Sequence, residues 1–254
     1  MKPEPLSSFL SWKPEQRPEV VQGGVLPEGQ VMFIYGEYGV FKSWLAMDLA
    51  YCVSIGEPWL VYPTTRHRVL IVNTEIGPVD YQKRWAVYTA KRTVTSNGLY
   101  VATDMDWRLD TGMGLNEIGA LVRQYSVELL VIDNLYSTAQ GDISKNSDAK
   151  VFIDNCKFLQ SHTTPPVAIV IVHHSRQPLA DIRGQAISQH AYEMFGSSFF
   201  PNWADTIMEV KRVYEPGFSD SVQVSPKKHR LAPFVLDSFT YQFKRQQPNF
   251  DVLV

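Results

Sequence analysis

The chain has 254 residues, of which 44% are hydrophobic and 20% charged, and its 24 Lys and Arg nearly balance 26 Asp and Glu. This is the composition of a globular protein with one or two domains, which excludes disordered and collagen-like chains. Two cysteines are too few for a disulfide framework or a cysteine-rich zinc module. No apolar run approaches the ~18 residues of a membrane span, and charges and prolines interrupt the N-terminal region. We therefore expect a soluble cytoplasmic protein with no membrane partner.

The order of apolar and polar segments predicts an α/β fold. Residues 1–25 are interrupted by prolines and lack helical periodicity, which predicts an extended arm before a single domain over residues 26–254. Four short apolar runs follow, at 31–35, 69–73, 128–133 and 167–172. Their continuous hydrophobicity is typical of parallel strands that are covered on both faces. Helices are predicted through 45–53 (ending at Gly56), 78–92, 115–125 and 147–160.

From residue 206 the pattern changes to shorter strands that polar turns separate, at 206–210, 221–224 and 234–243. The sequence therefore predicts a mostly parallel sheet with helices on both faces and antiparallel strands at its C-terminal end.

A phosphate-binding loop is predicted where the first apolar run ends. The segment reads Gly36, Glu37, Tyr38, Gly39, Val40, Phe41, Lys42, Ser43, and Trp44 continues into the predicted helix. At such a junction backbone N–H groups cradle phosphates, Lys42 reaches the β- and γ-phosphate oxygens, and Ser43 binds Mg²⁺. Phe41 departs from the pattern G-x-x-x-x-G-K-[ST], because phenylalanine does not readily adopt the positive φ of glycine. Either the local backbone differs or nucleotide affinity suffers; the alternative is a turn with a chance Lys-Ser pair.

Two carboxylates follow later strands of the predicted sheet. Glu75 comes after the run 69–73, and Asp133 ends the run 128–133. Ligands of α/β sheets bind at the carboxyl ends of the strands, so both side chains are expected beside the phosphate loop. There Glu75 is a candidate base for the water that attacks a γ-phosphate, and Asp133, assisted by Asn134, is a candidate Mg²⁺ ligand. The alternatives are a solvated loop acid and a turn-forming acid.

Residues 36–59, GEYGVFKSWLAMDLAYCVSIGEPW, resemble the nucleotide-binding segment of RecA-type ATPases of the RepA/DnaB helicase group, which is common in plasmids and phages. The similarity extends from about Pro27 to about Phe243. A phenylalanine before the Lys-Ser pair occurs in that group, so the resemblance implies that Phe41 is tolerated. It also implies a RecA-like P-loop core that uses ATP and Mg²⁺, with Glu75 as the catalytic glutamate and Asp133 as the Walker B aspartate.

Two adjacent histidines, His173 and His174, close the fourth apolar run. On a strand they point to opposite faces and cannot easily share a metal ion, and the other histidines lack metal-ligand spacing. The resemblance implies that a polar side chain here senses the γ-phosphate and links the site to DNA-binding loops. We expect one of the two only to end the strand, and the sequence does not distinguish which.

The long connection 175–203 is the segment in which the resemblance implies loops that contact single-stranded DNA. Relatives often have arginine where this chain has Phe195. The candidate DNA contacts are Arg176, Arg183, Ser197 and Ser198. Three aromatic residues of this segment either stack on bases or seal the core beneath the loop: Phe195, Phe199 and Phe200.

A local basic excess lies in the C-terminal third, where residues 211–245 hold seven Lys and Arg against three Asp and Glu. Such a stretch is usually a solvated face. The resemblance implies instead that Lys228 and Arg230 form an element that acts on the γ-phosphate of a neighbouring subunit, as an arginine finger does. The active site would then be complete only in a homo-oligomer, which is expected to be a hexameric ring.

These features predict an ATP-hydrolysing motor on single-stranded DNA, and most specifically a RepA-like ring-shaped replicative helicase. Two alternatives remain open: a RecA-like DNA-dependent ATPase of recombination or repair that does not unwind, and a nucleotide-binding regulator with weak turnover. The RecA fold hosts all three, so fold alone does not choose among them. The complete set of residues favours a motor, because a pure nucleotide binder needs neither a base nor a finger.

Overall fold

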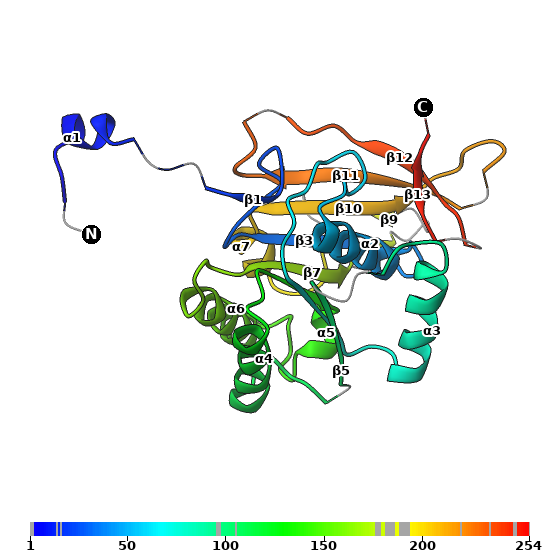
Figure 1. The fold of residues 1–254 in the computed structure, drawn as a ribbon, viewed down its shortest axis with the longest axis horizontal. Helices are drawn as coiled ribbons and strands as arrows, with labels where there is room; N and C mark the ends of the chain where they lie inside the picture. The colour runs from blue at the N-terminus through cyan, green and yellow to red at the C-terminus, as the bar shows by residue number, and fades with distance from the viewer. Residues whose placement is uncertain are drawn as a thin grey trace.

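Figure 1 shows the fold in a computed structural model, which describes residues 3–13, 15, 17–94, 98–104, 106–175, 179–180, 186–187, 194–218, 220–233, 235–245 and 248–253. The strands of the central sheet are β3 (Val31–Gly36), β4 (Val69–Asn73), β5 (Leu99–Thr103), β6 (Leu129–Asp133), β7 (Ala168–His174), β10 (Thr206–Arg212), β11 (Ser221–His229), β12 (Phe239–Phe243) and β13 (Phe250–Val252). Their order is β13-β12-β11-β10-β3-β7-β6-β4-β5. The strands from β10 to β5 are parallel to their neighbours, whereas β10 to β13 pair antiparallel, which confirms the predicted fold class.

Helices cover both faces of this sheet. They are α1 (Leu6–Ser11), α2 (Lys42–Ile55), α3 (Pro78–Thr89), α4 (Gly112–Gln124), α5 (Leu135–Thr138), α6 (Asn146–Ser161) and α7 (Phe199–Trp203). One apolar core lies between the sheet and helices α2 and α3, and a second between the sheet and helices α4 to α7. Two short antiparallel pairs, β1 (Glu19–Val21) with β2 (Leu26–Pro27) and β8 (Leu179–Ala180) with β9 (Ala186–Ile187), complete the described elements.

The continuous apolar runs explain the centre of the sheet. Every residue of β3, β4 and β6 is buried, because the two layers of helices remove both faces of these strands from water. Helix α2 is buried nearly all round, and it ends at Gly56, whose φ of 79° allows the chain to turn back. Since β3, β4, β6 and β7 are parallel, the loops that follow them meet at one edge of the sheet.

One prediction about local structure is wrong, and one parallel strand was not predicted. The expected extended arm contains helix α1 and strand β1, and Val20, Val21 and Val25 are fully buried, so this part of residues 1–25 packs into the core. Strand β5 was not predicted, because an edge strand whose residues are partly buried or exposed carries a weak apolar pattern. Helix α1 buries no residue and projects away from the sheet (Figure 1). Among the described residues, no helix is long and apolar enough to cross a bilayer.

Candidate nucleotide-binding site

The predicted phosphate loop connects β3 to α2, and its backbone turns through two residues with positive φ. A side chain at Gly36 would place its Cβ 2.1 Å from the carbonyl oxygen of Val210, so only glycine fits there. Gly39 has a φ of 75°, and Phe41 precedes α2 with φ 63° and ψ 20°. Phe41 therefore adopts the left-handed conformation that glycine has at this place in the pattern. The loop thus keeps a positive φ before Lys42, so a different local backbone, one of the two expected consequences of Phe41, is not present. The other expected consequence is a weaker nucleotide affinity.

Aromatic packing holds Phe41 in this conformation. A left-handed residue other than glycine costs about 1–3 kcal/mol, and the surrounding structure must compensate for that cost. The Phe41 ring stacks on Phe243 of β12 with centroids 4.2 Å apart. The guanidinium groups of Arg212 and Arg245 lie 5.5 and 5.1 Å from the centre of the same ring. The C-terminal strands therefore support the phosphate loop directly.

Lys42 is the first residue of α2 and is only 6% exposed. Its Nζ donates a hydrogen bond to the backbone oxygen of Glu37, across the loop. Burial lowers the pKa of Lys42 to about 8, and the nearby carboxylates of Asp133 and Glu75 limit this decrease. A buried ammonium group enclosed by the loop is the cation that a bound phosphate chain would pair with.

Ser43 and Asp133 form a second contact of the site. The Ser43 hydroxyl donates to Oδ1 of Asp133 across 3.1 Å. Asp133 is 1% exposed, and burial, together with the charge of Glu75, raises its pKa to about 6. A hydroxyl and a desolvated carboxylate beside a phosphate loop fit Mg²⁺, a hard cation that takes oxygen ligands and usually binds one or two carboxylates together with substrate phosphates. The donors present therefore suit the predicted ion.

Glu75 lies at the same edge of the sheet, two residues after β4. Its Oε2 accepts a hydrogen bond of 2.7 Å from Nδ2 of Asn134, and that same amide nitrogen lies 3.4 Å from Nε2 of His174. The side-chain oxygen of Asn134 caps α5 by accepting from the backbone N–H of Ser137. Because its orientation is fixed in this way, Asn134 holds Glu75 beside the pocket and links it to His174.

The two histidines of β7 have different surroundings. His174 lines the pocket and stacks on Tyr38 of the phosphate loop, with centroids 4.1 Å apart. His173 is fully buried on the other face, where its Nε2 lies 2.6 Å from the carbonyl oxygen of Phe195 and burial lowers its pKa to about 4. Of the pair that the sequence could not resolve, His174 is the one that lines the cavity, and His173 is a core residue.

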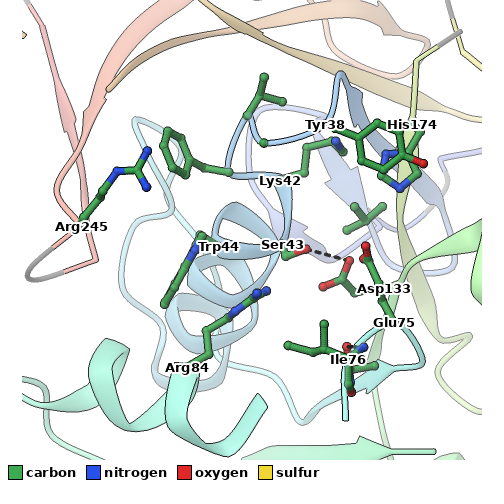
Figure 2. Close-up of a pocket in the computed structure, with 15 residues that line it drawn as sticks. Tyr38, Lys42, Ser43, Trp44, Glu75, Ile76, Arg84, Asp133, His174 and Arg245 are labelled. Carbon is green, nitrogen blue, oxygen red and sulfur yellow. Dashed lines mark hydrogen bonds between the residues drawn. The ribbon is translucent and has the colours of Figure 1, made fainter. Parts of the chain in front are cut away.

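The phosphate loop from Tyr38 to Ser43 lines a cavity of about 300 Å³ together with Glu75, Asp133 and His174 (Figure 2). Sequence reasoning missed two cations there, Arg84 of α3 and Arg245, which follows β12. The guanidinium of Arg84 lies 5.3 Å from the ring centre of Trp44. The packing of α3 and the pairing of β12 in the sheet bring these arginines to the pocket. Neither arginine belongs to a sequence motif, so the sequence did not identify them.

Lys228 and Arg230 do not reach this pocket. Lys228 pairs with Ile207 near the start of β10, which runs parallel to β3, so both basic residues lie at the opposite edge of the sheet from the phosphate loop. Lys228 donates to the backbone oxygen of Pro201, and Arg230 pairs with Asp205 at 3.0 Å. The two cations therefore serve no function in the nucleotide pocket of their own chain.

The candidate DNA contacts differ in their exposure to solvent. Ser197 is only 4% exposed and its hydroxyl donates to Asn146, so in this structure its side chain is engaged within the fold. Ser198 is exposed. Phe200 is fully buried and seals the core, whereas Phe195 and Phe199 are each 38% exposed. Arg176 and Arg183 lie outside the described residues.

The sheet order, the phosphate loop and the carboxylates at one sheet edge define a RecA-like P-loop ATPase. Residues 2–179 match the family model described as AAA domain, and the chain belongs to that family. A solved structure with a similar fold is the KaiC-like protein of the hyperthermophilic archaeon Pyrococcus horikoshii, with a TM-score of 0.60 and 15% identity. The match covers 95% of this chain and 100% of that one. No curated protein matches in sequence.

Proposed function

We propose that the protein hydrolyses ATP as a ring-shaped motor on single-stranded DNA, and that it is a RepA-like replicative helicase. The observation that carries the proposal is the separation of two sets of chemical groups. Lys42, Ser43, Asp133 and Glu75 converge on one pocket, whereas Lys228 and Arg230 lie at the far edge of the sheet. Cations so placed do not reach the pocket of their own chain, so their proposed action on a γ-phosphate requires a neighbouring copy of the chain.

In the proposed reaction, backbone N–H groups of the phosphate loop and the Lys42 ammonium hold the β- and γ-phosphates. Glu75 accepts a proton from the attacking water, whose oxygen bonds to the γ-phosphorus while the bond to the β–γ bridging oxygen breaks. Bound Mg²⁺ supplies charge neutralisation at the phosphate oxygens, and Ser43 and Asp133 are the residues that would hold it. His174 lies where it can contact the γ-phosphate and transmit its presence to the connection that follows β7.

The test is an ATPase assay of the purified full chain with and without single-stranded oligonucleotide at a fixed low salt concentration, because contacts to the nucleic-acid backbone depend on salt. We expect stimulation by DNA, displacement of the paired strand of a tailed duplex, and at least a ~100-fold loss of turnover in Glu75→Gln with ATP binding retained. Lys42→Ala should lose turnover altogether.

The outcomes separate the three functions that the sequence leaves open. Stimulation by DNA without strand displacement would indicate a DNA-dependent ATPase of recombination or repair. Turnover that no oligonucleotide changes would indicate a nucleotide-binding regulator. Full turnover in Lys42→Ala would refute the assignment of the phosphate loop.

A further inference from the structure

The nucleotide pocket has a second end that the proposed hydrolysis does not use. Figure 2 shows Trp44, Arg84 and Arg245 on one side of the start of α2, and Asp133 and Glu75 on the other. The side with the carboxylates is where Mg²⁺ and the attacked γ-phosphate would lie. The opposite side offers aromatic rings and guanidinium groups.

These groups form two layers, each of which pairs a planar cation with a ring. Arg84 lies 5.3 Å from the ring centre of Trp44, and Arg245 lies 5.1 Å from that of Phe41. Phe243 joins the layers, because its ring stacks on Phe41 at 4.2 Å and contacts Trp44 at 5.6 Å. The extended aromatic cluster reaches the mouth of the pocket, where Trp44 and Arg245 are lining residues.

We propose that Trp44 and Arg245 form the subsite for the base of the nucleotide, and that Phe41 supports it. This inference rests on the proposed binding of a nucleoside triphosphate at the phosphate loop. With the γ-phosphate at the carboxylate side and the β-phosphate at Lys42, the ribose and base extend towards the opposite end. Indole rings and guanidinium planes stack on the flat faces of bases, and such stacking is tolerant of the exact base edge.

In this subsite Phe41 supports the guanidinium of Arg245. Phenylalanine at this position carries a backbone cost that glycine would avoid. Its ring packs against the Arg245 guanidinium, which also donates two hydrogen bonds to the Asp220 carboxylate, so that the ring and the carboxylate together fix the cation. The departure from the usual loop pattern thus couples the antiparallel C-terminal strands to recognition of the base.

Binding of ATP is best compared with binding of inorganic tripolyphosphate, which has the phosphates but no base, by calorimetry of the full chain with Mg²⁺ present. We expect Arg245→Ala and Trp44→Leu each to weaken ATP binding by ~5- to 100-fold, and to change tripolyphosphate binding by less than about twofold. Trp44→Phe should retain most of the ATP affinity, because it keeps an aromatic face. Phe41→Gly should lose selectivity for ATP over tripolyphosphate, since Arg245 loses its support.

Lys244→Ala is the matched control. Lys244 is the neighbour of Arg245, pairs with Asp251 and does not line the pocket, so its removal changes the net charge equally and should leave both affinities unaltered. Arg245 is more than half exposed, so its substitution is expected to fold. Equal weakening of both ligands in Arg245→Ala, or unchanged ATP affinity, would overturn the base subsite. A wild-type chain that binds neither ligand would refute the nucleotide-binding function itself.

Discussion

Replacing Asp133 by Asn is expected to abolish ATP turnover and, in the absence of ligand, to stabilise the protein. Asp133 is 1% exposed, and burial raises its pKa to about 6 from an ordinary value of 3.8. Keeping this carboxylate ionised at neutral pH therefore costs the folded state about 3 kcal/mol. Asparagine has nearly the same shape, and its amide oxygen still accepts the hydrogen bond from Ser43.

The stabilisation has a defined dependence on pH. Because the pKa of Asp133 is higher in the folded than in the unfolded chain, folding takes up a proton between about pH 4 and pH 6, and the stability of the wild type falls as the pH rises through that window. The Asp133→Asn variant is free of this loss. Its advantage is expected to grow from about 2 kcal/mol at pH 5 to about 3 kcal/mol at pH 8.

The assay is urea unfolding of both chains from pH 5 to pH 8 in the presence of EDTA and without nucleotide. Glu37→Gln removes an exposed carboxylate from the same loop, and its free energy of unfolding should change by less than about 0.5 kcal/mol. If the Asp133→Asn variant were no more stable than the wild type at pH 8, or if its advantage did not grow with pH, the inference that Asp133 is a strained, desolvated carboxylate would be wrong.

Two further substitutions test the positions of other groups. Asn134→Ser keeps a cap for α5 but removes the donor that orients Glu75, so kcat should fall by about 10-fold with ATP affinity unchanged, and an unaltered kcat would show that the contact does not position the base. Arg230→Ala should bind ATP normally but not hydrolyse it. In mixtures of the two chains, ATPase activity should fall more steeply than the fraction of wild-type chain. A linear mixing curve would remove the role of Arg230 in a neighbouring site.

The sequence predicted the part of the site that comes from contiguous motifs. Continuous apolar runs locate β3, β4, β6 and β7, and parallel strands necessarily bring the residues after them to one edge. Lys42, Glu75 and Asp133 could therefore be assigned without coordinates. What could not be predicted is the side of the pocket built by packing. Arg245 arrives there because β12 pairs in the sheet beyond β10 and β11, and a contact between a cation and a ring has no characteristic spacing in sequence.

Phe41 illustrates a different limit. The chemistry of the residue predicted a conflict with a positive φ, and the structure contains both the residue and that φ. The conflict is resolved by Phe243, which is some 200 residues away in the chain and identifiable as a partner only when β12 is in place. The local propensity of phenylalanine disfavours a positive φ, and a tertiary contact overrides this propensity.

The adjacent histidines give the most direct comparison of a core and a site residue at the same strand end. His173→Ala removes a buried ring that contacts Phe33 and Phe200 and leaves the carbonyl of Phe195 without its partner. A loss of ~2–4 kcal/mol of unfolding free energy is expected, with little effect on the turnover of the chains that remain folded. His174→Ala removes a half-buried pocket residue, so turnover should fall while stability changes by less than about 1 kcal/mol. The measurements are urea unfolding and kcat per folded chain. A loss of turnover in His173→Ala together with a loss of stability in His174→Ala would exchange the two assignments.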